Sequence, residues 1–103
     1  MFLALWEFDV KPGCDERFEN VYGPDGDWAR LFRRDTAYRR TLLLRDPFRG
    51  QTYLTCDFWE TRRAYEAFRE NHLEAYLALD RECEEFTVAE RKVGEFEQLA
   101  EDE

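Results

Sequence analysis

Apolar side chains occupy every second position from Phe2 to Val10, and this alternation constrains the fold more than any other feature of the chain. Such a period of two residues is typical of a β-strand that packs one face against a core. The positions in between start with Leu3 and Leu5 before they become acidic, so both faces of the strand begin apolar. A sheet built on this strand needs cover on two sides, and helices on one face supply only half of it.

Apolar residues at helical spacing predict two short helices after this strand, over 14–22 and 28–32, with Asp27 as the candidate N-cap of the second. Two further strands are expected at 38–45 and 51–59. The segment between them contains Pro and Gly and has the composition of a turn, so the two strands should form a β-hairpin.

A long helix is predicted after Thr61, its candidate N-cap, from apolar residues that recur three and four positions apart. That apolar stripe should face the sheet, and a break near Asn71 that divides the helix in two stays open. Thr87 and Glu90 have the spacing of a capping box, which predicts a turn of helix before the last strand, over 91–96.

The order strand, helix, helix, strand, strand, helix, strand predicts an α+β domain of ferredoxin-like type with a four-stranded antiparallel sheet. One domain is expected over residues 1–100, followed by an acidic tail at 101–103. Helices should cover one sheet face, and the other face is expected to carry Leu3, Leu5, Leu43, Tyr53, Thr55 and Trp59. A monomer rarely exposes so large an apolar patch, so we expect a homodimer in which two sheets pack face to face.

The composition argues against several classes of function. A net charge of −9 disfavours nucleic-acid binding, which depends on clustered basic residues. No segment reaches the roughly 20 apolar residues that cross a membrane, and the N-terminus lacks the pattern of a signal peptide. The three cysteines have neither zinc-site nor disulfide spacing, so we expect reduced thiols, a cytoplasmic location and no metal site. The five glycines form no nucleotide-binding motif, and no cofactor is expected.

Several segments resemble the antibiotic biosynthesis monooxygenase-like (ABM) group of the dimeric α+β barrel superfamily. They are the strand 38–45, the segment 53–61 that ends in Trp-Glu-Thr and runs into Ala64, Tyr65 and Phe68, the pair Leu79-Asp80, and the segment 93–96. The resemblance covers nearly the whole chain. It implies a dimeric α/β barrel with one small pocket per subunit between sheet and helices. The chemistries it implies include cofactor-free oxygenation of polycyclic aromatics and oxidative breakdown of haem.

The haem-degrading branch of that superfamily carries an Asn on the first strand, a Trp on the long helix and a later His on the same helix. In this chain those places hold Trp6, Phe68 and Ala78, so all three depart from the pattern. His72 lies six residues ahead of the place of the haem ligand. Haem chemistry therefore has less support from the resemblance than cofactor-free oxygenation has.

His72 is the only imidazole and the candidate catalytic residue, because a histidine ordinarily titrates between about pH 5 and 8. In a pocket it can polarise a phenol or a carbonyl before oxygen attacks, whereas at a helix break a histidine often bonds only to backbone. Trp6, Phe68 and Tyr76 are the candidate walls of a pocket for a planar apolar ligand. Aromatic residues at such spacing also build cores, so this alternative stays open.

Two acidic residues, Glu7 and Asp57, interrupt otherwise apolar strands and are candidate bases. We interpret them as facing solvent or as paired across the sheet with Arg39 or Arg45. Together these observations predict a cytoplasmic homodimer that binds a small aromatic or lipophilic molecule. Cofactor-independent monooxygenation is the candidate activity. A non-catalytic dimeric binding module and a haem-binding or haem-degrading protein are the alternatives.

Overall fold

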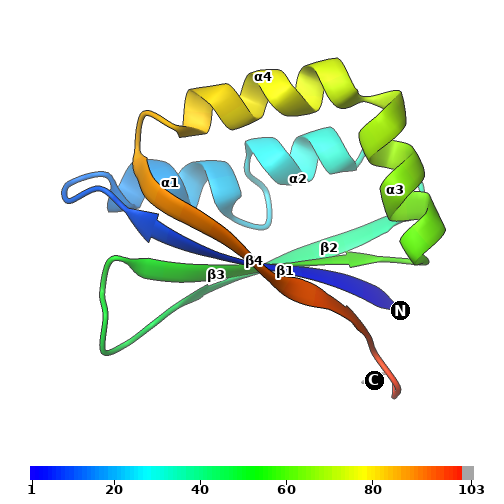
Figure 1. Cartoon of the computed structure of the whole chain (residues 1–103), viewed down its shortest axis with the longest axis horizontal. Coiled ribbons are helices and arrows are strands. Elements are labelled where there is room, and N and C mark those ends of the chain that lie inside the picture. The colour runs from blue at the N-terminus through cyan, green and yellow to red at the C-terminus, as the bar shows by residue number, and fades with distance from the viewer. Residues whose placement is uncertain (101–103) are drawn as a thin grey trace.

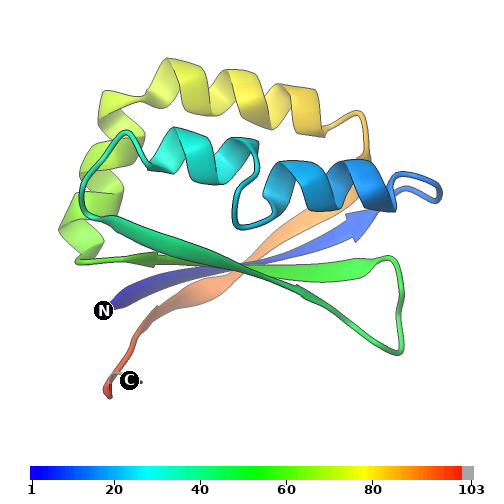
Figure 2. The same cartoon turned by 180° about the vertical axis from the view of Figure 1, so that it is seen from behind.

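A computed structural model describes residues 1–100 of the chain, and the expected acidic tail at 101–103 lies outside the described residues. The elements follow in the order β1 (Phe2–Val10), α1 (Asp15–Tyr22), α2 (Asp27–Phe32), β2 (Tyr38–Arg45), β3 (Thr52–Trp59), α3 (Arg62–Asn71), α4 (Leu73–Cys83) and β4 (Thr87–Glu97). Figures 1 and 2 show all the helices on the same side of one sheet. The longest of these helices has 11 residues, and none in the described part of the chain is both long and apolar enough to cross a membrane.

The sheet has four strands in the order β2-β3-β1-β4, and each neighbouring pair is antiparallel. The first and last strands of the chain are thus neighbours, and the β2–β3 hairpin joins the sheet through β3. This arrangement confirms the predicted α+β, ferredoxin-like class with its four-stranded antiparallel sheet.

The register of β1 against β3 decides which side chains the helices cover. Phe2 lies opposite Trp59, and Trp6 lies opposite Thr55. Directly opposed residues in an antiparallel pair project to the same face, so Trp59 and Thr55 share the helix-covered face with the buried Phe2. Tyr53 and Leu43 follow them to this face through their pairing with Phe8 and Thr55. The expectation that these four residues face away from the helices was wrong, whereas Leu3 and Leu5 do lie on the far face.

The core between sheet and helices is built mainly from aromatic rings. Trp59, Tyr53, Phe18, Phe68 and Phe86 are among its largest fully buried side chains. The ring of Phe32 on α2 meets Trp59 edge-on at 5.4 Å between centroids, and it meets Phe68 on α3 in the same way at 5.5 Å. Edge-to-face pairs of this kind add about 0.5–1.5 kcal/mol each beyond the area they bury. They therefore fix the spacing between the helices and the sheet.

The predicted long helix is divided at His72. Thr61 is the N-cap of α3, and its hydroxyl accepts a 3.1 Å hydrogen bond from the Ala64 N–H. The helix ends at Asn71, and His72 has φ −123° and ψ 28°, outside the helical range. Its N–H still bonds to the Phe68 carbonyl, and its own carbonyl accepts from the Tyr76 N–H. The axis therefore turns while the backbone groups stay paired.

Two predicted capping residues differ from those observed. The N-cap of α2 is Gly26 rather than Asp27, which is the first helical residue. A side chain cannot replace Gly26, because a Cβ there would lie 2.3 Å from the carbonyl oxygen of Val21. The predicted turn of helix at Thr87 is absent, since β4 starts at that residue. The Thr87 hydroxyl instead donates a 2.9 Å hydrogen bond to the Cys83 carbonyl at the end of α4.

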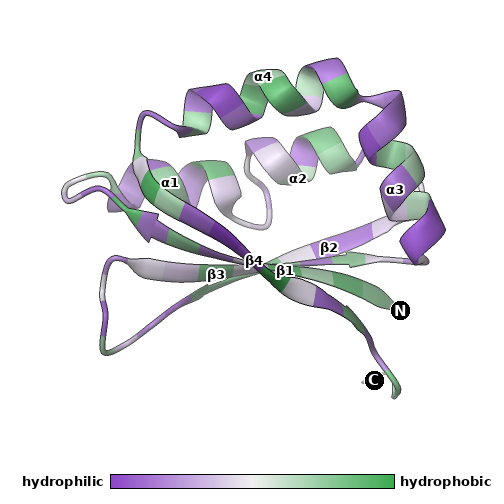
Figure 3. Ribbon diagram, in the orientation of Figure 1, coloured by the Kyte–Doolittle hydropathy of each residue, from purple (hydrophilic) through white to green (hydrophobic). Residues whose placement is uncertain are grey.

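The sheet face away from the helices, called the open face below, is largely apolar. Figure 3 shows that the first half of β1 is hydrophobic. The strand pairings place on this face Leu3, Leu5, Leu42, Leu44, Leu54, Cys56, Phe58 and Phe96. Exposed fractions of 36% for Leu42, 48% for Leu44 and 49% for Phe96 leave a contiguous apolar patch in contact with solvent.

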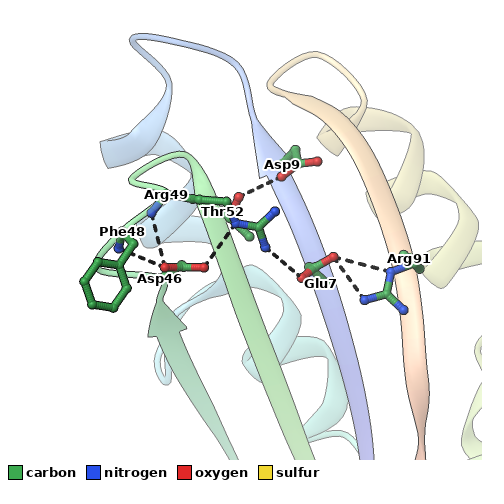
Figure 4. Close-up of polar contacts among 7 residues, drawn as sticks. All are labelled: Glu7, Asp9, Asp46, Phe48, Arg49, Thr52 and Arg91. Atoms are coloured by element: carbon green, nitrogen blue, oxygen red, sulfur yellow. Dashed lines mark hydrogen bonds and ion pairs between the residues drawn. The ribbon is translucent and has the colours of Figure 1, made fainter.

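One end of the open face is polar (Figure 4). Glu7 on β1 lies between two arginines, 3.1 Å from Arg91 on β4 and 3.6 Å from Arg49 in the β2–β3 hairpin. Arg49 also contacts Asp46 in the same hairpin at 3.2 Å. The prediction that Glu7 faces solvent or pairs with Arg39 or Arg45 therefore named the wrong partners, although the pairing across the sheet is present.

Candidate functional site

A small cavity lies between the helix-covered face of the sheet and the helices. Its apolar walls are Trp6, Phe8, Tyr22, Trp28, Phe32 and Tyr76. Its polar lining consists of Thr41, Thr55, Asp57, Asp80 and Glu90. The volume is about 30 Å³, which is room for about two water molecules. Aromatic walls with a few polar groups are typical of a site for a planar organic molecule.

Asp57 forms the floor of this cavity. It lies on β3 between Ala4 on β1 and Thr41 on β2, and it is 7% exposed. The hydroxyl of Thr41 donates a 2.8 Å hydrogen bond to its Oδ1. Thr41 is itself 2.7 Å from the hydroxyl of Tyr38, which must act as donor because the Thr41 hydrogen is already used. The three side chains form one hydrogen-bonded row across β2 and β3.

The proton affinity of Asp57 is unusual for a carboxyl group. Burial raises its pKa from the ordinary 3.8 to about 7, and the hydrogen bond from Thr41 opposes that rise only in part. No lysine or arginine in the described part of the chain forms an ion pair with it. Within residues 1–100, no group donates a hydrogen bond to its second oxygen, Oδ2. That oxygen is available to whatever occupies the cavity.

Two more carboxyl groups lie where the cavity opens to the surface. Asp80 on α4 and Glu90 on β4 line both the cavity and an adjoining open depression that also contains Glu84. Partial burial, followed by repulsion from Glu84, raises the pKa of Asp80. The pKa of Glu90 is raised by burial and then by Asp80 and Glu84. The opening is therefore acidic, and its carboxyl groups repel one another.

The aromatic walls hold each other in place above Asp57. Trp28 on α2 meets Tyr76 on α4 edge-on, with 4.9 Å between ring centroids, and Tyr22 on α1 lies 6.0 Å from Trp28. The indole Nε1 of Trp28 is buried and has no hydrogen-bond partner among the described residues.

Comparisons with known proteins show the fold but no close sequence relative. No protein-family model matches this sequence, and no curated protein matches it either. Solved structures do match. SnoaB, a cofactor-independent oxygenase from Streptomyces nogalater, superposes with a TM-score of 0.76 at 19% identity, over 97% of this chain and 94% of that one.

Two other solved structures match to a similar extent. A Bordetella bronchiseptica protein provisionally named an antibiotic biosynthesis monooxygenase has a TM-score of 0.72 at 21% identity, over 96% of this chain and 97% of its own. PA3566 from Pseudomonas aeruginosa has a TM-score of 0.67 at 17% identity, over 96% of this chain and 94% of its own. This chain has the ABM fold. The resemblance seen in the sequence is confirmed at the level of the fold.

The ABM fold brings together two of the four predicted site residues. Trp6 and Tyr76 line the cavity. Phe68 is fully buried in the core. His72 lies at the junction of α3 and α4, with its ring 4.7 Å from that of Phe68, and neither of these two residues lines the cavity. The roles of Trp6 and Tyr76 stay predictions that their place in the cavity supports, and those of His72 and Phe68 stay predictions without that support.

Asp57 is the polar group at the centre of the cavity, and its surroundings were predicted wrongly from the sequence. Arg39 and Arg45, its predicted partners, contact Glu60 and Glu19 instead. Asp57 is two positions from Trp59, so the two side chains project to the same face. The spacing of two residues is a sequence signal that could have placed the Asp57 carboxyl group on the helix-covered face with Trp59. Among residues 1–100, no group of three His, Cys, Asp or Glu side chains is arranged to hold a metal ion.

Proposed function

We propose that this protein binds a planar aromatic molecule in the cavity above Asp57 and oxidises it with O₂ without a cofactor. The observation that carries the proposal is the buried Asp57 carboxyl, whose pKa of about 7 suits a general base at neutral pH. The similar structure of SnoaB, a cofactor-independent oxygenase, supports the same reaction class. Fold alone does not assign an activity, so the chemistry of the cavity has to support it.

In such a reaction the substrate supplies all the electrons. Asp57 removes a proton from a phenol or from an activated CH₂ group, and the resulting anion reduces O₂ and combines with it. Overall, R₂CH₂ and O₂ give R₂C=O and H₂O, and a phenol with a free para position, C₆H₅OH, and O₂ give the quinone C₆H₄O₂ and H₂O. In both reactions one oxygen atom enters the product and the other leaves as water. Asp57 gives the first proton to the peroxide formed at carbon, then removes the second C–H proton as the O–O bond breaks, and passes it to the departing hydroxide to complete the water molecule. The carboxyl group is thus regenerated in each cycle.

The walls of the cavity have two tasks in this scheme. Trp6 and Tyr76 hold the ring of the substrate against the sheet, and Trp28 packs against Tyr76 from the helix side. Apolar walls also exclude water, which strengthens the interaction between Asp57 and a substrate proton. Tyr76 is not a base near neutral pH, because burial raises the pKa of its hydroxyl.

Oxygen consumption tests the proposal. The wild type is compared with Asp57→Asn and His72→Ala on a panel of anthrones and hydroquinones. Loss of the base in Asp57→Asn should lower kcat/KM by about 10²–10⁴-fold, while His72→Ala, outside the cavity, should stay within a few-fold of the wild type. Near-ultraviolet circular dichroism checks that both variants keep the native packing. An Asp57→Asn variant with full activity, or a wild type that consumes no oxygen with any substrate of the panel, would contradict the proposal.

We also propose that two copies associate through the open face. Its leucines and Phe96 form an exposed apolar patch, and contiguous patches of this kind mark interaction surfaces. Packing the same face of two chains together buries the patch and forms a closed barrel from two sheets. The Glu7, Arg49 and Arg91 network would then lie at the rim and help to fix the register of the two sheets.

A reducing, cytoplasmic location is consistent with the cysteines. Cys14, Cys56 and Cys83 are all free thiols in the structure. Exported proteins more often pair such residues in disulfides. We therefore propose that the protein acts in the cytoplasm.

A further inference from the structure

The cavity is lined by three carboxyl groups and by no basic side chain. Asp57 lies at its floor, and Asp80 and Glu90 lie at its opening. Elsewhere the acidic residues are commonly paired, as Glu7 is with two arginines and Glu60 is with Arg39. Within residues 1–100 no ion pair or hydrogen bond neutralises the side chain of Asp80 or Glu90. Carboxylates left unpaired in a half-buried opening are costly unless a cation reaches them.

Cations do lie nearby, but outside the cavity. Lys92 is 5.6 Å from the centroid of the Trp6 ring and forms an ion pair with Glu95. Arg69 is 5.0 Å from the centroid of the Tyr76 ring. Both basic residues lie close to rings that line the cavity, but neither is part of its lining. Neither forms a salt bridge with a cavity carboxyl in the described structure, although the charge of Arg69 partly opposes the rise that burial causes in the pKa of Asp80. The Trp6 and Tyr76 rings thus already take part in cation–π contacts.

Asp57 points to a ligand independently of the acidic opening. Its side chain is more than nine-tenths buried, and its Oδ2 has no donor within the described part of the chain while the residue lines the cavity. This oxygen gives the interior an acceptor for a hydroxyl group on a ring. The interior suits a phenol, and the opening suits a cation.

We propose that the substrate of this site is a phenolic aromatic molecule that carries a protonated amine. Its hydroxylated ring lies against Asp57 between the aromatic walls, and its ammonium group lies between Asp80 and Glu90 at the opening. The inference rests on the proposed function, since it names the class of substrate for the same cavity. The proposal also predicts that the cavity binds anionic analogues poorly, because its three carboxyl groups repel them.

A matched series of catechols tests the charge preference. Dopamine, 4-ethylcatechol and 3,4-dihydroxyphenylacetate share one ring and differ in the charge of the side group. Binding is followed by quenching of tryptophan fluorescence, because Trp6 and Trp28 line the cavity. Dopamine should bind at least about tenfold more tightly than the neutral catechol, and the anion should bind most weakly. Added salt should reduce the differences in affinity between the three probes, because it screens the charges.

Charge-neutralising variants locate the effect. Asp80→Asn and Glu90→Gln should each reduce the preference for dopamine over 4-ethylcatechol by about three- to tenfold. Glu74→Gln is the matched control. Glu74 is an exposed residue of α4, the helix that also carries Asp80, and it does not line the cavity. This variant should leave the preference unchanged.

The outcomes separate this inference from the proposed function. Equal affinity of the wild type for dopamine and 4-ethylcatechol would overturn the amine proposal. An unchanged preference for dopamine in both Asp80→Asn and Glu90→Gln would overturn it too. Neither result depends on whether the protein consumes oxygen. Preferred binding of dopamine without any oxygen consumption supports the amine site and contradicts the proposed oxidation. Failure of all three probes to bind overturns the inference.

Discussion

Thr41 on β2 and Asp57 on β3 face each other in the sheet register and share a 2.8 Å hydrogen bond. Both side chains are buried, and Tyr38 continues the row by bonding to Thr41. Burial raises the pKa of Asp57, and the bond from Thr41 is the contact that lowers it. The proton affinity of the proposed base is therefore set first by burial and is lowered in part by its neighbour on the adjacent strand.

Replacing Asp57 with Asn should change how stability depends on pH. The folded pKa of about 7 exceeds the ordinary 3.8, so between these values the folded chain holds a proton that the unfolded chain releases. The wild type therefore loses stability as the pH rises towards 7, by about 2 kcal/mol between about pH 5.5 and pH 8. Asn does not ionise and should not show this loss. Urea unfolding at both pH values measures the free energy of unfolding of each protein. An equal loss of stability in the wild type and in Asp57→Asn would argue against the raised pKa.

Replacing Thr41 with Val should raise the pKa of Asp57 further, because the hydrogen bond that lowers it is lost. Titration of the Asp57 carboxyl carbon by nuclear magnetic resonance gives the pKa without reference to activity. The loss of a buried hydrogen bond should also cost about 1–3 kcal/mol of stability. Thr41→Ser keeps the hydroxyl and serves as the control. A pKa in Thr41→Val equal to that in Thr41→Ser would show that the bond does not tune the group.

Replacing Thr61 with Ala should lower the free energy of unfolding by about 1 kcal/mol. The Thr61 side chain caps α3 by accepting the Ala64 N–H, and alanine leaves that N–H without a partner. Thr61→Ser keeps the acceptor and should remain close to the wild type. Chemical denaturation of the three proteins measures the effect. A cost in Thr61→Ser as large as in Thr61→Ala would mean that the methyl group, and not the cap, stabilises the helix.

Replacing Leu42 with Glu should dissociate the proposed dimer. Leu42 lies on the open face and is 36% exposed in the single chain, so the charge is tolerated in a monomer but not between two packed sheets. The dissociation constant should rise by about 30-fold or more. Leu77→Glu, at a 46% exposed position on α4, is the matched control. Analytical ultracentrifugation of both variants at micromolar concentration decides the matter, and equal association of the two would exclude the open face as the interface.

Much of the fold could be predicted because local patterns determine it. The alternation from Phe2 to Val10 gave the first strand, and Thr61 marked the start of α3, both as observed. The face of β3 was less predictable, because both of its sides are apolar. Tyr53 and Trp59 project to one side and Leu54 and Phe58 to the other, and only the long-range pairing with β1 decides between them.

The site was harder to predict than the fold for a related reason. His72 drew attention as the only imidazole, yet the turn at Asn71 places it beyond Phe68 and outside the cavity. Asp57 was a candidate base, but it was interpreted as facing solvent or as paired with Arg39 or Arg45 across the sheet. Its position follows from which side of β3 the helices cover, and that is a property of the assembled sheet.

The small volume of the cavity bears on the kinetics of binding. In this structure the space above Asp57 is about 30 Å³, which no aromatic ring can occupy until Trp28, Tyr76 or their neighbours move aside. The slow step of association is then a motion of the protein and not a collision with the ligand. In a stopped-flow experiment the observed rate should level off as the ligand concentration increases, at the frequency with which the free protein opens.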